Sequence, residues 1–237
     1  MHARITIEET ALFADPAGAL FWPATKTLIV ADLHLEKGSA FAAKGVPLPP
    51  YDTRATLDAL QRLIRRYTPE RVVCLGDSFH DKDAGKRIAS NDRDHLARMM
   101  KGLDWVWVLG NHDPQIPPEM GGRVVPEIAE GKLILRHEPA RPVLAPGEIV
   151  GHFHPKACVV TKIGRVVAPC FTTDGRRMVM PAFGAYTGGL DTLDRAISGL
   201  FGRTRWRVLM TGRDNLHLFP AGRLEPVVRR APKPGQE

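Results

Sequence analysis

The feature of the sequence that most limits its possible folds is a recurring pattern. Short apolar runs are each followed, within a few residues, by polar side chains of the metal-ligand type. Runs of this length and β-branched content predict buried strands. In α/β sheets, the loops beyond the carboxyl ends of the strands gather on one edge and form the ligand crevice. We therefore expect residues far apart in the sequence to meet at one site. Six of the nine histidines are among the residues that follow the runs. The full set of these residues is Asp32, His34, Asp77, His80, Asn111, His112, Asp113, His137, His152 and His154.

The order of the predicted elements indicates the fold class. The first half of the chain alternates strand and helix, whereas the second half is mostly strand. This order predicts an α/β or α+β sandwich in which two central β-sheets are flanked by helices. We expect a single domain over residues 1–230 and a disordered C-terminal tail over residues 231–237. Strands are expected at 28–31, 72–75, 105–109, 133–135, 157–160, 165–168, 178–180, 207–210 and 216–219, and helices at 52–66 and 91–101.

The residue types at the ends of the runs suit two divalent cations. Aspartate and histidine are ligands for Mn, Fe or Zn, and the asparagine amide offers a neutral oxygen. The two oxygens of a carboxylate such as Asp77 can bridge two ions that lie about 3.5–4 Å apart. Asp32 and His34 are two residues apart, as are His152 and His154, so on extended backbone each pair faces one side. The pattern as a whole predicts a two-metal site.

Some residues of similar type have simpler explanations. His2, His95 and His217 lie outside the pattern, and we expect them to be ordinary surface or half-buried residues. The alternation of Trp105 and Trp107 is typical of strand packing rather than of base stacking.

Composition excludes several classes of protein. With 43% hydrophobic and 25% charged residues, the chain is not collagen-like, coiled-coil or broadly disordered. No stretch of about 18 apolar residues is present, so no membrane span is expected. The first residues show no secretory signal. Three cysteines without CxxC spacing indicate neither a disulfide framework nor a thiolate zinc site. We therefore expect a cytoplasmic protein.

The charge distribution points weakly to a polyanionic partner. The formal net charge is +7, and residues 199–237 carry eight basic residues against three acidic ones. Such a skew can steer polyanions to the surface, which makes Arg203, Arg205 and Arg207 weak candidates for DNA contacts. The alternative is a soluble protein that is simply rich in arginine.

The ordered motifs DxH, GDxxH, GNHD, a single His and GHxH resemble those of the calcineurin-like metallophosphoesterase superfamily over about residues 27–155. The longer segments ADLHLEKGSAFAAKG, GDSFHD and PAFGAYTGG are similar to those of the bacterial PdeM family. Members of that family are ligase-associated DNA damage response endonucleases, encoded near DNA ligase and helicase repair genes. The resemblance implies a β-sandwich flanked by helices and a manganese-dependent nuclease that acts on single-stranded DNA.

The resemblance also implies roles for individual residues. One metal would be held by Asp32, His34, Asp77 and His154, and the other by Asp77, Asn111, His137 and His152. His112 would be the catalytic histidine beside the phosphate, oriented by Asp113 or His80. Many phosphatases of the superfamily have Asp-Arg where this chain has His80-Asp81, a difference that favours a DNA-repair nuclease over a phosphomonoesterase. His137 has almost no motif around it.

The sequence thus favours a metal-dependent phosphodiesterase that is a single-strand DNA endonuclease in DNA repair. Two divalent ions, Mn or alternatively Fe or Zn, would neutralise the phosphate and lower the pKa of a water molecule. The alternatives are a small-molecule phosphomonoesterase or nucleotide pyrophosphatase on the same core, and a non-catalytic scaffold. Intact Asn111 and His112 argue against the scaffold. Expected partners are single-stranded DNA, DNA ligase and helicase repair proteins and a second copy of the chain, but no membrane.

Overall fold

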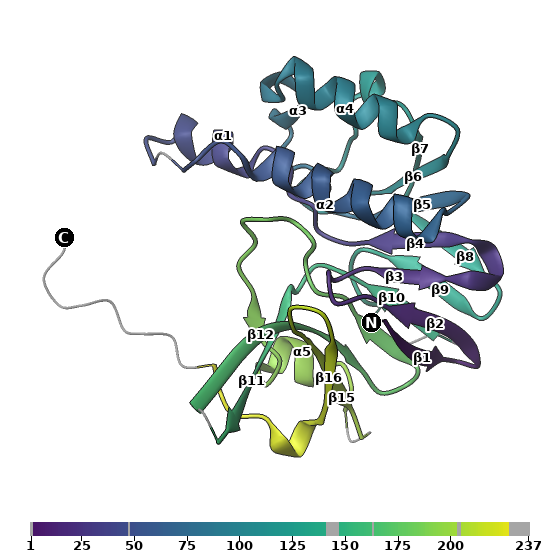
Figure 1. Ribbon diagram of the computed structural model, residues 1–237, viewed down its shortest axis with the longest axis vertical. Helices are drawn as coiled ribbons and strands as arrows, with labels where there is room; N and C mark the ends of the chain where they lie inside the picture. The colour runs from purple at the N-terminus through teal and green to yellow at the C-terminus, as the bar shows by residue number, and fades with distance from the viewer. Residues whose placement is uncertain (1, 47, 141–146, 163, 203–204, 228–237) are drawn as a thin grey trace, which may run out of the picture.

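The computed structural model describes residues 2–46, 48–140, 147–162, 164–202 and 205–227. Two mixed β-sheets, of seven and nine strands, lie against each other, and helices cover the outer face of the first sheet (Figure 1). The expected fold class, two central sheets flanked by helices, is confirmed.

The first sheet begins as an antiparallel meander and continues as four parallel strands. The parallel strands read as continuous apolar runs because both of their faces are buried. Their order in the sheet is the order in the sequence, so their carboxyl ends lie side by side along one edge. The strands are β1 (Ala3–Ile7), β2 (Thr10–Ala14), β3 (Leu20–Trp22), β4 (Thr27–Val30), β5 (Arg71–Leu75), β6 (Asp104–Val108) and β7 (Arg123–Val125).

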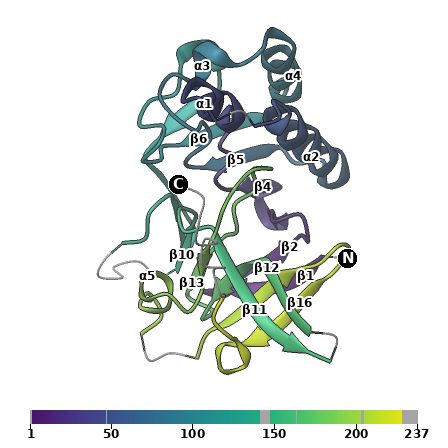
Figure 2. The ribbon, with the colours of Figure 1, turned by 90° about the vertical axis from the view of Figure 1, so that its left-hand side faces the viewer.

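Four helices lie on the outer face of this sheet (Figures 1 and 2). Leu57, Leu60 and Leu63 form the buried face of the second helix, and they share one apolar cluster with Trp105 and Trp107 of β6. The two tryptophans therefore serve packing, as expected. The helices are α1 (Lys37–Ala43), α2 (Asp52–Tyr67), α3 (Ala84–Arg87) and α4 (Ser90–Met100), and the short helices elsewhere are α5 (Arg195–Ser198), η1 (Pro23–Thr25), η2 (Pro118–Met120) and η3 (Ala221–Arg223).

The second sheet packs on the inner face of the first. Alternate residues of the parallel strands, such as Ile29 and Val73, form one cluster with Leu135 and Ile149 of the second sheet. The ten-residue strand β12 pairs with β11 over its first half and with β13 and β15 over its second half. The strands are β8 (Glu127–Glu130), β9 (Leu133–Arg136), β10 (Gly147–Val150), β11 (Pro155–Thr161), β12 (Gly164–Thr173), β13 (Arg177–Val179), β14 (Leu190–Asp191), β15 (Arg207–Thr211) and β16 (Leu216–Pro220).

The expected elements are all present, but several further ones were not foreseen. These are the meander β1–β3, the short strands β7, β8 and β14, and the short helices α1, α3, α5 and η1–η3. One expectation is wrong: His95 is buried, with 7% of its surface exposed, because it lies on the inner side of α4. His2 and His217 are exposed, as expected. The expected tail at 231–237 lies outside the described residues. No helix in the described part of the chain is long and apolar enough to cross a membrane.

Candidate metal centre

The candidate site lies where the carboxyl ends of parallel strands from both sheets meet. In the first sheet, β4, β5 and β6 lead into Asp32, Asp77 and Asn111. In the second sheet, the parallel pair β9 and β10 leads into His137 and His152. The two sheets pack face to face through one apolar cluster, and this packing brings the two sets of loops together. The ligand crevice therefore combines both halves of the chain, which the order of motifs predicted.

The backbone of the site is held in an unusual conformation. Asp32, His34, Asp77, His152 and His154 all have positive φ angles, between 44° and 72°. Residues other than glycine rarely adopt this left-handed region, which costs on the order of 1–3 kcal/mol for each residue. These five account for half of the ten such non-glycine residues that the structure describes. Strained backbone of this kind is typical of functional sites and is maintained by the packing around it.

One set of side chains, here called the first ligand group, consists of Asp32, His34 and His154. Nε2 of His34 lies 3.1 Å from Nε2 of His154, which in turn lies 3.3 Å from Oδ1 of Asp32. Asp32 is fully buried, and both of its oxygens accept the main-chain N–H of His152 at 3.1 Å. The three side chains therefore direct one donor atom each toward a common point.

The second ligand group consists of Asp77, Asn111, His137 and His152. Nε2 of His137 lies 3.0 Å from Oδ1 of Asn111 and 3.3 Å from Oδ2 of Asp77. Nδ1 of His152 lies 2.9 Å from the same asparagine oxygen and 3.3 Å from Nε2 of His137. His137, the residue with the weakest sequence signal, is thus at the middle of this group. Its Nδ1 donates to the carbonyl oxygen of Leu75 at 3.1 Å, which fixes the ring and turns Nε2 toward the other donors.

Asp77 lies within reach of both groups. Its Oδ2 is 3.3 Å from Nε2 of His137 and 3.9 Å from Nε2 of His34. Oδ1 accepts the main-chain N–H of His112 at 2.9 Å, which fixes the carboxylate. A carboxylate in this position can serve two ions at once.

The chemistry of these donors fits divalent cations. Donor atoms around one ion, with bonds of about 2.0–2.2 Å, lie roughly 3 Å apart, and the separations within each group are 2.9–3.3 Å. Buried carboxylates need a compensating positive charge. In the described part of the chain, the ion pairs of Asp32 and Asp77 are all with imidazoles and none is with lysine or arginine. Two cations would supply the missing charge.

Burial and charge also set the protonation of the ligands. Burial, aided by the neighbouring His154, lowers the pKa of His34 to about 2, so its ring is neutral and can offer a lone pair. Burial opposes ionisation of Asp77, but the hydrogen bond and charge of His137 outweigh it and lower the pKa of Asp77 to about 2. Burial opposes a charge on His137 as well, but the hydrogen bond to Asp77 and the charge of Asp32 outweigh it and raise the pKa of His137 to about 9. A metal binds the anionic carboxylate and the neutral ring, so an ion at this group would displace the proton of His137.

His80 and His112 lie beside the first ligand group. Their rings stack with centroids 5.5 Å apart, and both face the edge of the His34 ring. Nδ1 of His112 lies 2.9 Å from the main-chain carbonyl oxygen of His80, whereas Asp113 has other partners. The buried carboxylate of Asp113 accepts the main-chain N–H groups of Ser78, Phe79 and Gly110 at 2.7–3.1 Å. The group that orients the His112 ring is therefore the backbone of His80, and Asp113 joins two loops of the site.

The sequence did not reveal a network that supports the loop of His80. The guanidinium of Arg87 on α3 contacts both carboxylate oxygens of Asp81 at 2.8 and 2.9 Å and donates to the Ser39 hydroxyl at 3.0 Å. Ser39 in turn donates to the buried carboxylate of Glu36 at 2.7 Å. The network ties α1 and α3 to the residue after His80. The contact between Arg87 and Ser39, which are 48 residues apart, has no local motif because the packing of the helices brings the two residues together.

The arginines proposed for DNA contacts lie elsewhere. Arg205 and Arg207, at the start of β15, are exposed and belong to neither ligand group. Arg203 lies outside the described residues.

Comparisons with known proteins agree with this geometry. Residues 25–176 match the family model described as calcineurin-like phosphoesterase. The crystal structure of Pseudomonas putida nuclease MPE is similar at 28% identity and a TM-score of 0.69, over 93% of this chain and 100% of that one. Yfce, a phosphoesterase from E. coli, is 13% identical over 85% of this chain and 96% of its own, with a TM-score of 0.38 that carries no functional weight. No curated protein matches the chain.

Proposed function

The chain belongs to the calcineurin-like phosphoesterase family, and from that premise we propose that it is a metal-dependent endonuclease that cleaves single-stranded DNA in DNA repair. The observation that carries the proposal is the pair of ligand groups that share Asp77. The similarity to a Pseudomonas putida nuclease over nearly the whole chain supports a nucleic-acid substrate. Because both sheets contribute ligands, we also propose that residues 1–230 act as a single domain.

We propose that the first ligand group holds one divalent ion and the second holds another, with Asp77 between them. When bound, the two ions neutralise phosphate oxygens and lower the pKa of water, so that a nucleophile forms near neutral pH. The mixture of aspartate, asparagine and histidine donors suits manganese, iron or zinc, and the resemblance to the PdeM family makes manganese the proposed ion.

His112 is proposed to supply the proton that the departing oxygen needs. Its Nδ1 donates to the carbonyl oxygen of His80, which leaves Nε2 as the nitrogen that can exchange a proton. The residue is exposed, as is its neighbour Asn111, so a phosphodiester within a long strand can approach both. A histidine that donates a proton to the leaving group contributes typically 10²- to 10⁴-fold to the rate.

The charge distribution supports a polyanionic substrate. Residues 1–151 carry 19 Lys and Arg against 20 Asp and Glu, whereas residues 152–237 carry 14 against 6. The net positive charge of the protein therefore resides in the second part of the chain, which includes β11–β16. Such an asymmetry directs a long anionic strand to one side of the molecule.

The proposal is tested with three substrates and a series of metals. The protein is incubated with Mn²⁺, Fe²⁺, Zn²⁺ or Mg²⁺ and circular single-stranded DNA, duplex DNA or bis-p-nitrophenyl phosphate. We expect the circle to be linearised fastest with Mn²⁺ and the duplex to be cut slowly. A circle has no ends, so its cleavage requires an endonuclease. If only linear DNA is degraded, the protein is an exonuclease. If only bis-p-nitrophenyl phosphate reacts, the protein is a small-molecule phosphodiesterase or pyrophosphatase of the same family.

The role in repair is a separate part of the proposal. Deletion of the gene should raise sensitivity to DNA-damaging agents, and a gene with Asp77→Ala should fail to restore resistance. Association with DNA ligase or helicase repair proteins is tested by co-purification from cells treated with a damaging agent. Normal resistance in the deletion strain would contradict the repair role without affecting the nuclease assignment.

A further inference from the structure

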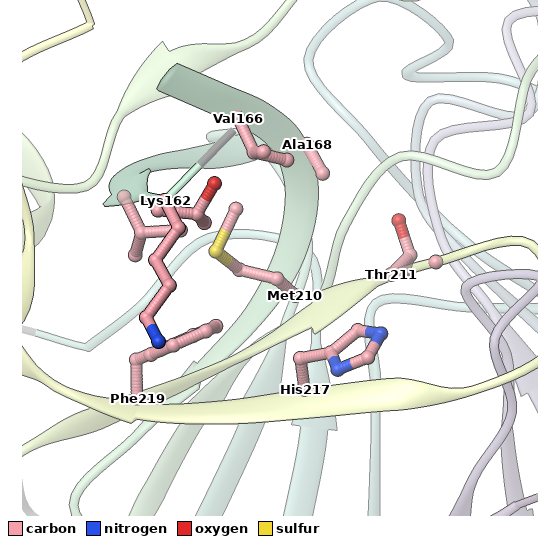
Figure 3. A pocket seen from close by; sticks show the side chains of 10 residues that line it. Lys162, Val166, Ala168, Met210, Thr211, His217 and Phe219 are labelled. Carbon is pink, nitrogen blue, oxygen red and sulfur yellow. The ribbon is translucent and has the colours of Figure 1, made fainter. Parts of the chain in front are cut away.

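We infer that a pocket at the far end of β11 from the metal centre binds a base of the single-stranded substrate, a few nucleotides from the cleaved bond; this inference rests on the proposed function. The pocket has a volume of about 440 Å³ and lies between the β11–β12 and β15–β16 hairpins (Figure 3). Its residues belong to neither ligand group, and the sequence analysis assigned them no function. They include Val159, Ala168, Met210, His217, Phe219 and Lys162.

The pairing of the strands explains how the pocket forms. On β15 and β16, Met210 lies opposite His217, and Val208 lies opposite Phe219. Because neighbouring residues on a strand point to opposite faces, these four side chains share one face, while Leu218 points to the other. The strongly curved strand β12 closes the opposite wall with Val166 and Ala168 (Figure 3).

The pocket walls suit the flat face of a base. The sides are aliphatic, with the Phe219 ring and the Met210 thioether among them. Figure 3 shows the Lys162 side chain reaching across the pocket so that its ammonium lies near Phe219, and the His217 ring stands at the other side. Aromatic and apolar side chains bind any base by stacking, and an adjacent cation meets the phosphate. Because the walls offer few hydrogen-bonding groups, binding is expected to tolerate all four bases.

Charge complementarity favours a nucleic acid over a second copy of the chain as the occupant. Between residues 152 and 227 the sequence carries 11 Lys and Arg against 5 Asp and Glu. Two copies, each with a formal net charge of +7, repel one another, whereas a strand of DNA brings negative charge. Lys162 at the pocket then pairs with a phosphate that follows the stacked base.

The pocket lies at a distance that one DNA strand can span while its cleaved bond is at the metal centre. Strand β11 begins directly after His154, runs for seven residues and ends at Thr161, which lines the pocket. At about 3.3 Å per residue, the pocket is roughly 20 Å from the first ligand group. Grooves for single-stranded nucleic acid commonly cover about 4–16 nucleotides. One DNA strand can therefore occupy the metal centre and the pocket at the same time.

The test measures binding of fluorescein-labelled dT oligonucleotides of 3 and 12 nucleotides, in EDTA to prevent cleavage. We expect the 12-mer to bind the wild-type protein much more tightly than the 3-mer. Phe219→Ala should weaken binding of the 12-mer about 5- to 100-fold, the range found when a stacking side chain is removed. Lys162→Ala should weaken it less and should also reduce its dependence on salt. Leu218→Ala is the matched control, because it removes an exposed side chain from the other face of the same strand.

A second variant guards against loss of folding in Phe219→Ala. Ala168→Phe adds a ring that fills the pocket from the opposite wall, and it should weaken 12-mer binding while its melting temperature stays near that of the wild type. In addition, 4-thiothymidine placed a few nucleotides from the cleavage site should crosslink to Met210 or Phe219.

Equal affinity of Phe219→Ala, Ala168→Phe and Leu218→Ala for the 12-mer would overturn the inference. So would a change from dimer to monomer in Ala168→Phe, which would identify the pocket as a contact between copies. If the wild-type protein bound neither oligonucleotide and cut no DNA, the proposed function itself would fail.

Discussion

The main-chain carbonyl oxygen of His80 lies 2.9 Å from Nδ1 of His112. Because a carbonyl oxygen can only accept, Nδ1 carries a proton, and Nε2 is the nitrogen left to exchange a proton with the substrate. The ring is further held by stacking on His80 and by edge contact with His34. The orientation of His112 is therefore set by its neighbours without any bond from its own side chain to a carboxylate.

From this relationship we predict that His112→Ala retains both metals and loses cleavage. The main-chain N–H of residue 112, which fixes Asp77, remains in the variant, so the ligand groups persist. The rate should fall roughly 10²- to 10⁴-fold. Metal content by mass spectrometry and initial rates on single-stranded DNA test this, with the exposed His2→Ala as control. Near wild-type cleavage by His112→Ala would show that another group supplies the proton.

Asp77→Ala should lose metal and cleavage together. The carboxylate approaches the Nε2 atoms of His34 and His137, one from each ligand group, and its removal leaves Asp32 as the remaining carboxylate paired with the ligand histidines in the described part of the chain. We expect fewer than two bound ions per chain in equilibrium dialysis against Mn²⁺ and no measurable cleavage. Asp83→Ala, an exposed change in the following loop, should bind metal as the wild type does. Two tightly bound ions in Asp77→Ala would contradict the bridging role.

Arg87 is predicted to position the loop of His80 rather than to contact substrate. Arg87→Ala breaks the contacts with Asp81 and Ser39, and displacement of catalytic groups by about 1 Å can cost 10²-fold. We expect kcat to fall about 10- to 100-fold with KM and metal content nearly unchanged. Arg87→Lys should restore part of the rate because it keeps the charge. Lys86→Ala, whose partner Asp83 is exposed, is the control. A rise in KM alone would indicate substrate contact.

Two glycines in one loop give a matched pair of variants. A methyl group on Gly184 would lie 2.2 Å from the carbonyl oxygen of Leu33, between Asp32 and His34, whereas one on Gly188 would meet nothing within 4 Å. Gly184→Ala must therefore shift the backbone that carries two ligands, at a cost of about 1–3 kcal/mol in the free energy of unfolding. Chemical denaturation should show a lower free energy of unfolding, and Mn²⁺ titration a lower metal affinity, in Gly184→Ala only. Equal free energies of unfolding and equal Mn²⁺ affinities in the two variants would mean that the loop accommodates the added methyl group.

The sequence predicted the parts of the fold that depend on local pattern. The parallel strands β4, β5 and β6 were found because they are buried on both faces and read as continuous apolar runs. Helix α2 was found because its apolar residues recur at helical spacing. The short helix α1 was missed: its residues 37–43 carry few large apolar side chains, and the helix is held by Asp52, which accepts the N–H of Gly38.

For the site, the motifs identified residue types but could not give their partners. Asp113 follows His112 in the sequence, yet its carboxylate binds the backbone of a different loop. His137 showed almost no sequence signal, although the structure places it 3.0 Å from Asn111. The first relationship arises because β5 and β6 are neighbours in one sheet, and the second arises from the packing of one sheet on the other. Local pattern encodes neither.

The last prediction concerns Arg203, Arg205 and Arg207. Arg205 and Arg207 are exposed and belong to neither ligand group, so with Arg203 they should contact only a long anionic strand. Replacing the three by alanine should weaken cleavage of single-stranded DNA far more than hydrolysis of bis-p-nitrophenyl phosphate. Each lost phosphate contact should reduce the slope of log affinity against log salt concentration by about 0.7.

The control removes two other exposed arginines, Arg62 and Arg65 on α2, from the part of the chain that carries no net positive charge. Their replacement should leave the salt slope near its wild-type value. Equal loss on both substrates in the triple variant would mean that these arginines act at the metal centre. An unchanged salt slope would show that the positive charge of this region does not guide DNA, and the case for a nucleic-acid substrate would then depend on the similarity to the Pseudomonas putida nuclease alone.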